Sequence, residues 1–388
     1  MRILLLNANR AGVGTYFRAY YFGRELAKRG HEAVLLTVSN AHRFRSVSRE
    51  DPSGLRVTEM PNLFDELLPW HASGPLDIIR RVGAAVVGPY DLIYAFEYQP
   101  NVSVPALAAR WLRGRALVSD WCDWHAGASY HFGGKSWAHK IDRFFEEFIR
   151  HRADHLTVIN HTLRDRAISI GIAPERVTVI REGVDPEYIK PLDRHEMRAQ
   201  LDLPLNSIIV GTIRDSAAAA ELLMHAIRLL APRLPSIRLL IVGKAPPSLL
   251  AMADRLGVRE LTILPGRVSD DDLPRYLACA DVLALPLEDN LINRGRWPHK
   301  LGDLLAAGRP VLVSVGGEFP EMLGQRGCAR VVSFEPAAYA AAVTDLLASP
   351  EGAADLARRG RELIVDELNW DRLGDQVASV VEGVMARK

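Results

Sequence analysis

Short runs of apolar residues alternate with amphipathic stretches along nearly the whole chain. This alternation predicts parallel β-strands connected by helices. In the first half the predicted strands span residues 3–6, 33–38, 55–60, 92–96, 116–119, 155–159 and 177–180. The predicted helices there span residues 15–29, 75–87, 103–112, 135–152 and 162–170. A second series of predicted strands spans residues 208–212, 239–242, 261–264, 282–285, 311–314 and 330–333.

The chain has 388 residues, which is long for a single hydrophobic core. Residues 181–193 separate the two series, are rich in turn formers and have no periodicity. We therefore predict an α/β protein with two doubly wound parallel-sheet domains, residues 1–182 and 183–367. Three predicted helices end the chain, with no further strand after them. Such domains bind ligands at the carboxyl ends of their strands, so we expect the two to face each other across a cleft.

Composition narrows the class of protein. Hydrophobic residues make up 48% of the chain and charged residues 24%, which is typical of a soluble globular protein. A net charge of +1 argues against a protein built mainly to bind nucleic acid. Cys122, Cys279 and Cys328 are too few for a disulfide framework or a zinc cluster.

The distribution of apolar and basic residues bears on location. No apolar run is long enough for a signal peptide or a membrane span, which predicts a cytoplasmic protein. The first half is slightly basic and holds most of the twelve histidines. This bias allows an anionic acceptor or a peripheral contact with the inner face of the cell membrane.

The segment NRGRWPHKLGDLLAAGRP is the most informative stretch. Pro298 suits the first position of a helix, and Gly308 suits the left-handed residue just past its end. Lys300 and Asp303 share a face away from the apolar stripe of this helix. They predict either a nucleotide site, with phosphate on the helix N-terminus and Lys300 and ribose on Asp303, or a simple surface ion pair.

The turn after the first predicted strand contains Gly12, Val13 and Gly14, and Thr15 is placed to cap the next helix. Bare amides in such a turn can approach a phosphate or leave room for a sugar. A tight turn without a ligand is the alternative. A dinucleotide-binding fingerprint fits poorly, because the third glycine and the acidic residue after the second strand are missing.

The segment LVSDWCDWHAG places Asp120 and Asp123 after a predicted strand. Carboxylates there can orient or deprotonate a hydroxyl, and Trp121 and Trp124 offer flat faces for a sugar or lipid. With His125 the spacing also permits a metal site, but nothing nearby completes the ligand set. A carboxylate that caps the following turn is the structural alternative.

Two arginines follow strands of the second series. Arg214 comes after the first strand and suits a bidentate contact to pyrophosphate, and Arg267 follows another strand at the same predicted edge. The run Asp270, Asp271 and Asp272 precedes a helix, and helix capping explains it better than a metal does.

These features together resemble the family-4 retaining glycosyltransferases of the GT-B fold. The resemblance rests on ELAKRGHEAVLLT, VINHTLRDRAISIGIAPERVTVIREGVD, IVGKAPP, LPGRVSDDDLPRYLACADVLALP and KLGDLLAAGRPVLVSVGGEFPEML, in that order. It covers essentially the whole chain. It implies transfer of a sugar from a UDP-, GDP- or ADP-linked donor, with retained anomeric configuration, without metal or other cofactor. The acceptor would be a glycan, a lipid-linked sugar or a small molecule bound by the first domain.

The resemblance also implies roles for particular residues. Asp303 would grip the donor ribose. Arg214 and Lys300 would hold the pyrophosphate, together with the amides around Trp297, Pro298 and His299. The turn formed by Gly12, Val13 and Gly14 would lie against the phosphates from the other side. The base would meet the backbone of Arg267 and Val268. The resemblance further implies that the last helix, at about residues 368–388, packs back on the first domain.

The sequence departs from the family pattern at three points. The first of two acidic residues falls on Gly295, which leaves Asn293, Arg294 and Arg296 to contact phosphate or sugar. A lysine expected after Arg214 is missing, and the family's usual histidine is replaced within residues 120–123. Asp120 or Asp123 would then stabilise the anomeric carbon or steer the acceptor. Two alternatives remain: a nucleotide-sugar epimerase, or a non-catalytic subunit that binds a nucleotide sugar.

Overall fold

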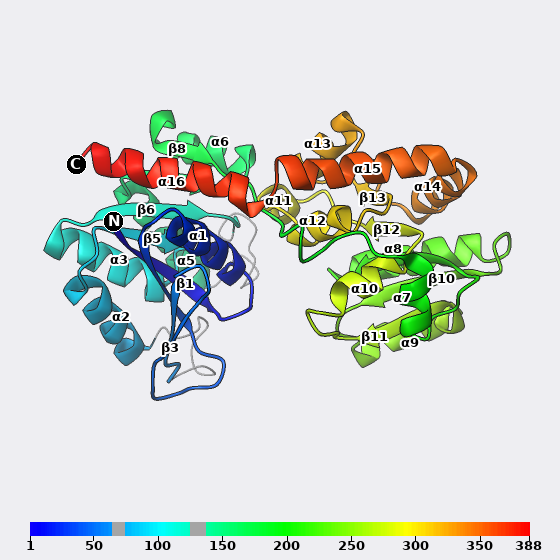
Figure 1. The fold of residues 1–388 in the computed structure, drawn as a ribbon, viewed down its shortest axis with the longest axis horizontal. Coiled ribbons are helices and arrows are strands. Elements are labelled where there is room, and N and C mark those ends of the chain that lie inside the picture. The colour runs from blue at the N-terminus through cyan, green and yellow to red at the C-terminus, as the bar shows by residue number, and fades with distance from the viewer. Residues whose placement is uncertain (64–73, 125–136) are drawn as a thin grey trace. The chain divides into compact units, whose positions relative to one another are not determined.

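A computed structural model describes residues 1–63, 74–124 and 137–388 of the chain. The chain forms two compact units (Figure 1). Unit 1 comprises Met1–Glu182, Gly295–Trp297 and Trp370–Lys388, and unit 2 comprises Gly183–Arg294 and Pro298–Asn369. Among the described residues, no helix combines the length and the apolar character that a membrane span requires.

Unit 1 contains a sheet of eight strands in the order β3-β4-β2-β1-β5-β6-β7-β8. The strands are β1 (Arg2–Arg10), β2 (Glu32–Val38), β3 (Val47–Glu50), β4 (Arg56–Met60), β5 (Leu92–Phe96), β6 (Ala116–Trp121), β7 (His155–Val158) and β8 (Val177–Val179). The helices are α1 (Tyr16–Lys28), α2 (Pro75–Val87), α3 (Pro100–Arg113), α5 (Trp137–Arg152), α6 (His161–Ser169) and α16 (Trp370–Ala386), with a 3-10 turn at Pro174–Arg176. All pairings are parallel except that of β3 with β4.

Unit 2 contains a parallel sheet of six strands in the order β11-β10-β9-β12-β13-β14. The strands are β9 (Ile208–Ile213), β10 (Ile237–Val242), β11 (Thr262–Gly266), β12 (Val282–Leu285), β13 (Val311–Ser314) and β14 (Arg330–Val332). The helices are α7 (Arg194–Gln200), α8 (Ala217–Leu230), α9 (Pro247–Arg255), α10 (Leu273–Ala278), α11 (Leu291–Arg294), α12 (His299–Ala306), α13 (Glu318–Arg326), α14 (Pro336–Ala348) and α15 (Pro350–Asp366), with a 3-10 turn at Arg259–Leu261. Each unit is thus an open Rossmann-like sheet, and the α/β fold class predicted from the sequence is confirmed.

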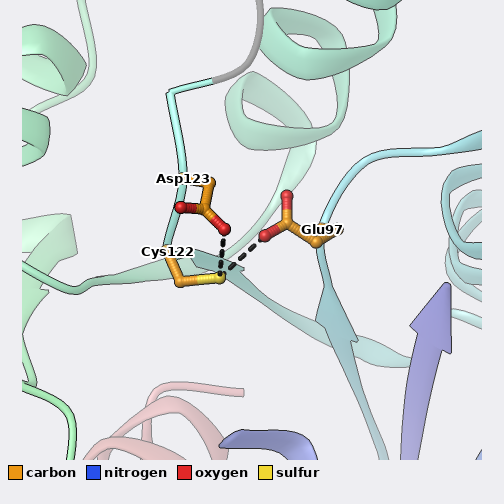
Figure 2. Close-up of side chains that lie close together, drawn as sticks. All are labelled: Glu97, Cys122 and Asp123. Carbon is orange, nitrogen blue, oxygen red and sulfur yellow. Dashed lines mark hydrogen bonds between the residues drawn. The ribbon is translucent and has the colours of Figure 1, made fainter. Parts of the chain in front are cut away.

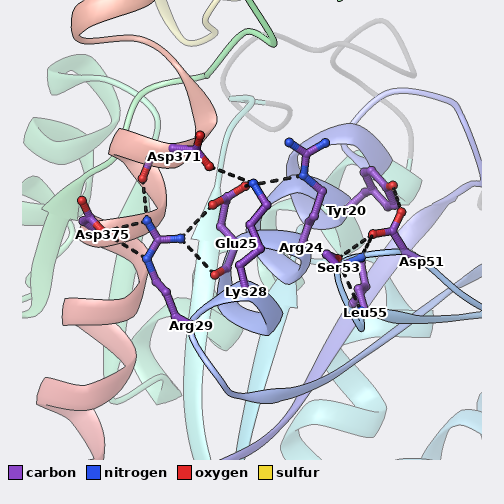
Figure 3. A network of polar contacts seen from close by, with 10 residues as sticks. All are labelled: Tyr20, Arg24, Glu25, Lys28, Arg29, Asp51, Ser53, Leu55, Asp371 and Asp375. Atoms are coloured by element: carbon purple, nitrogen blue, oxygen red, sulfur yellow. Dashed lines mark hydrogen bonds and ion pairs between the residues drawn. The ribbon is translucent and has the colours of Figure 1, made fainter. Parts of the chain in front are cut away.

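The last helix, α16, packs on the first helix, α1, and both cover one face of the sheet of unit 1. Trp370 stacks on Tyr21 with ring centroids 4.5 Å apart. Figure 3 shows the ion pairs that flank this contact: Arg29 donates to Asp375 and to Glu25, and Lys28 donates to Glu25. Apolar residues of both helices form the core of this contact, and the exposed pair of Arg29 with Asp375 contributes little.

Candidate active site

In unit 2, the start of α12 brings a lysine to the carboxyl end of β9. The Lys300 ammonium group donates hydrogen bonds to the Arg214 carbonyl oxygen at 2.9 Å and to Asp215 Oδ1 at 2.8 Å. Arg214 follows β9 directly, and its Nε is buried without a hydrogen-bond partner among the described residues. Two cations predicted from the sequence as pyrophosphate ligands therefore lie beside each other.

The helix that carries Lys300 differs at its start from the prediction. Pro298 has a ψ angle of 92°, which is not helical, so it precedes the first helical residue, His299. Its expected place inside the first turn is therefore wrong by one residue. Gly308 has a φ angle of 66°, and the left-handed residue expected past the helix end is confirmed. Asp303 is 8% exposed, and one of its oxygens lies 3.9 Å from His299 Nε2.

The residues before this helix are divided between the two units. Asn293 is buried in unit 2, where its Nδ2 donates to the Glu288 carbonyl oxygen at 2.7 Å. Arg294 makes a bidentate ion pair with Asp289 at 2.6 and 2.8 Å.

Gly295–Trp297 belong to unit 1 by their contacts. The Arg296 backbone forms an isolated antiparallel bridge with Asp123, and its carbonyl oxygen accepts from Asn160 Nδ2 at 3.2 Å. The Arg181 guanidinium lies 5.6 Å from the centre of the Trp297 ring. The predicted donor-binding segment thus does not stay together on one unit.

Arg267 and Val268 follow β11, the edge strand of the unit 2 sheet. Arg267 is exposed. Like Arg214 it lies at the carboxyl ends of the strands, but β10 lies between the strands that the two arginines follow. Val268 packs against a small core cluster that includes Met197 and Leu240. Nearby Asp272 lacks the predicted capping bond to the helix and instead accepts from Ser269 and Arg275.

The glycine turn of unit 1 is held by side-chain amides from β1. Gly12 and Gly14 have φ angles of 77° and 58°, and Val13 between them is 53% exposed. The prediction that Thr15 caps α1 is wrong, because its hydroxyl oxygen accepts hydrogen bonds from the Asn7 and Asn9 amides instead. A Cβ on Gly14 would lie 2.6 Å from Asn9 Nδ2, so another residue there would have to displace this amide, and the positive φ angle favours glycine as well.

Asp120 lies at the end of β6 and is fully buried. Both of its oxygens bind Arg18 of α1, at 2.8 and 3.0 Å, and Oδ1 also accepts from the Thr157 hydroxyl at 2.6 Å. Burial opposes the charge of Arg18, but Asp120 and Glu182 together raise the pKa of its guanidinium. The Arg18 side chain also donates to the carbonyl oxygen of Ile180. This geometry ties α1 to the sheet and fits a structural role for Asp120.

A second acidic group lies next to Asp120, at the carboxyl ends of β5 and β6 (Figure 2). The Cys122 thiol donates to Glu97 Oε1 at 2.7 Å, and its sulfur is 3.9 Å from Asp123 Oδ2. Burial and the two carboxylates raise the pKa of the Cys122 thiol well above its usual range, so it stays protonated. Glu97, Cys122 and Asp123 are close enough to one another to hold a metal ion.

Sequence reasoning missed Glu97, which has a φ angle of 74° and is 1% exposed. Its signal was its position directly after a buried strand, the same rule that identified Asp120 and Asp123. The predicted open face of Trp121 is wrong, because this ring is 1% exposed and lies under the Arg150 guanidinium at 4.1 Å. The Trp124 ring lies 5.6 Å from the Arg166 guanidinium, and His125 falls outside the described residues.

Comparison with known proteins identifies the chain. Residues 11–183 match the glycosyl transferase 4-like domain, and residues 205–349 match the glycosyl transferases group 1 domain. The MMP alpha-(1->4)-mannosyltransferase of Mycolicibacterium hassiacum is 26% identical, over 100% of this chain and 99% of its own length. A GDP-mannose-dependent alpha-(1-6)-phosphatidylinositol monomannoside mannosyltransferase of Mycolicibacterium smegmatis is 29% identical over 60% of this chain and 63% of its own length.

A solved structure shares the fold. HepE of Anabaena, in complex with UDP-glucose, superposes with a TM-score of 0.75 at 18% identity, over 99% of this chain and 100% of that one. The alternative of an epimerase is less supported, because both matched domains and both relatives are glycosyl transferases. The chain belongs to the group 1 glycosyl transferases with a 4-like amino-terminal domain and the GT-B fold, and its function is glycosyl transfer.

Proposed function

We propose that this glycosyl transferase uses a nucleotide-sugar donor held by unit 2 and retains the anomeric configuration of the sugar. The observation that carries the donor site is the pairing of Lys300 with the end of β9, next to Arg214. Cleavage of the sugar–phosphate bond builds negative charge on the diphosphate. Fixed cations and a helix N-terminus stabilise that charge without reorganising.

The remaining donor contacts follow from the same helix. Asp303 lies one turn after His299, and its carboxylate suits the ribose hydroxyls. The diphosphate would compete with Asp215 for Lys300, since both groups are anionic and would bind the same ammonium group. Two similar proteins support a nucleotide-sugar donor: the name of the Mycolicibacterium smegmatis relative specifies GDP-mannose, and the HepE structure contains UDP-glucose. Guanine and uracil are therefore both bases to be tested.

We assign acceptor binding to unit 1. Asp120 is already neutralised by Arg18, so Asp123 and Glu97 are the carboxylates better placed to steer an acceptor hydroxyl. The departing phosphate takes the proton of that hydroxyl, and no strong protein base is needed. We also propose that transfer is independent of metal, so EDTA should leave the rate unchanged. A rate that EDTA abolishes and Zn²⁺ or Mg²⁺ restores would contradict this.

The donor site is tested with Lys300→Ala and Asp303→Ala. Each should lower kcat/KM at least tenfold, which is about 1.4 kcal/mol of transition-state stabilisation. Lys190→Ala is the matched control, because Lys190 is an exposed lysine of the same unit that lies 4.0 Å from Glu187. Near-normal activity of both site variants would refute the assignment.

A thermal-shift panel of UDP-, GDP-, ADP- and dTDP-linked sugars identifies the base. A ligand at 100 times its Kd should stabilise unit 2 by about 2.7 kcal/mol. NMR of the first-formed product then reports its anomeric configuration, and inversion would refute retention. Epimerised donor without acceptor would favour the epimerase, and donor binding without transfer to any acceptor would favour a non-catalytic subunit.

We further propose that unit 1 contacts the membrane surface through an aromatic patch formed by Trp111, Phe144 and Phe148. Trp111 and Phe144 are more than half exposed. The centres of their rings lie 6.3 and 5.1 Å from the centre of the Phe148 ring. The Arg152 guanidinium lies over Phe148, and aromatic rings with nearby cations suit an anionic lipid interface.

Co-sedimentation with vesicles that contain phosphatidylglycerol tests the aromatic patch. Trp111→Ser with Phe144→Ser should lower the bound fraction at least threefold. Leu229→Ser, at an exposed apolar position of unit 2, is the control and should bind as the wild type does. Equal binding of all three proteins would exclude this surface.

A further inference from the structure

A pocket of about 580 Å³ lies at the end of the unit 2 sheet where the parallel strands begin. It is lined by residues that lie just before strands, Asp281 before β12 and Arg309 and Pro310 before β13, and by residues of α15. Arg214 follows β9 and so lies at the opposite end of the same parallel sheet, where the strands finish. The pocket is therefore separate from the proposed donor site.

The charged groups that line the pocket do not balance. Four arginines face it, and the acidic residues that line it are Asp281 and Glu362. Asp281 is already shared between Arg194 and the buried Arg198. Glu362 pairs with Arg358 at 2.7 Å.

The other two arginines make no close ion pair with a carboxylate among the described residues, and the charges of Asp281 and Glu187 act on Arg309 and Arg361 only from a longer distance. The hydrogen bonds of Arg309 and Arg361 go to backbone carbonyl oxygens: that of Leu192 for Arg309, and those of Ile189, Ala306 and Pro186 for Arg361. Burial lowers the pKa of Arg309, and the neighbouring Arg194 lowers it further. A positive excess thus remains in a partly desolvated place, where an anion is stabilised strongly.

Two donors in this pocket are also unused. The Nε atoms of Arg194 and Arg309 are buried and have no hydrogen-bond partner within the described part of the chain. A buried N–H group without an acceptor destabilises the folded protein, and a bound anion that accepts its hydrogen bond would remove this cost. The remaining wall is apolar and includes Leu346, Leu347 and Ala354.

We propose that this pocket binds a small organic anion, a phosphate monoester or a carboxylate carried on an apolar body. The planar guanidinium groups match the two or three oxygens of such a head group. The apolar wall of α14 and α15 receives the body of the ligand. The volume lies in the range of about 300–1,000 Å³ that is common for small-molecule sites.

Isothermal titration calorimetry with phenyl phosphate and with phenylacetate tests this inference on the full chain. At least one of the two should bind at a single site, while phenol, which lacks the charge, should not. Ala354→Phe fills the pocket from an exposed position of α15, and it should weaken binding at least tenfold. Ala341→Phe places the same ring at an exposed position of α14 outside the pocket and should have no effect.

Two further variants locate the bound anion. Arg309→Gln should weaken binding at least tenfold, and Lys300→Ala should leave it unchanged. Loss of binding in the Lys300 variant would place the probe in the donor site and overturn the inference. Binding of phenol as tightly as phenyl phosphate, unchanged binding in Ala354→Phe, or no binding of either anion would overturn it as well.

Discussion

Replacing Asp120 by Asn separates a structural role from a catalytic one. The Arg18 and Asp120 side chains are 1% and 0% exposed and make two charge-assisted hydrogen bonds. Asparagine has nearly the same shape, but it turns one acceptor into an N–H group that faces a guanidinium N–H. Removing one partner of a buried pair costs about 3–5 kcal/mol. We expect the lower end, about 3 kcal/mol, because Ile180 and Glu182 still accept from Arg18.

Urea unfolding measures this cost, and activity is compared at a temperature at which both proteins are folded. Thr157→Val is the graded control, since it removes a neutral hydroxyl that donates to Asp120 at 2.6 Å. The same hydroxyl also makes a hydrogen bond of 2.8 Å with the Tyr94 hydroxyl, so two bonds are lost, and at about 1 kcal/mol each the variant should cost about 2 kcal/mol. Folded Asp120→Asn should keep activity within about tenfold of wild type, or 1.4 kcal/mol. Unchanged stability with a thousandfold loss of kcat would refute the reasoning and place Asp120 at the reacting atoms.

Three further perturbations test the fold. Burial lowers the pKa of His155 to about 4, so the unfolded chain takes up a proton first as the pH falls from about 6.5. Urea unfolding should therefore reveal a loss of about 3 kcal/mol between pH 6.5 and 4, and His155→Gln should remove this loss; an unchanged pH profile would contradict it. Gly14→Ala should lower the melting temperature more than Gly12→Ala, because a Cβ on Gly14 meets a side-chain amide and one on Gly12 meets nothing within 4 Å; equal shifts would contradict that clash. Trp370→Ala should destabilise unit 1 by about 3–5 kcal/mol in the same assay, since the ring is 2% exposed; a cost below 1 kcal/mol would mean that α16 is not anchored there.

The fold could be predicted because each buried parallel strand is a short apolar run, as in residues 92–96 and 282–285. The strand that escaped prediction, β3, has the sequence VSRE and is exposed along its whole length. It lies at the edge of the sheet, and within the described ranges it pairs with β4 alone, so neither face imposes an apolar pattern. Its side chains meet β4 through polar contacts, Ser48 with Thr58 and Arg49 with Glu59, which exposed residues of any segment can make.

The residues of the candidate site could be predicted where they follow buried strands. Contacts between residues far apart in the sequence could not be predicted. Residues that directly follow buried strands gather at one edge of a sheet, and this identified Asp120, Asp123 and Arg214. The partner of Asp120 is Arg18, which lies 102 residues earlier on a helix. No local pattern distinguishes a helical arginine that will be buried from one that stays in solvent, so the structural use of Asp120 could not be read in advance.

The short helix α12 explains why the segment around Lys300 is so informative. Leu301, Leu304 and Leu305 are at most 1% exposed and fix the helix in the core of unit 2. A Cβ on Gly302 would lie 2.6 Å from Val184, so that position must stay small. Most positions of this helix are therefore buried in the core of unit 2. The same packing holds Lys300 against the end of β9. A lysine and an aspartate on so constrained a helix have fixed positions, which is what stabilisation of a diphosphate requires.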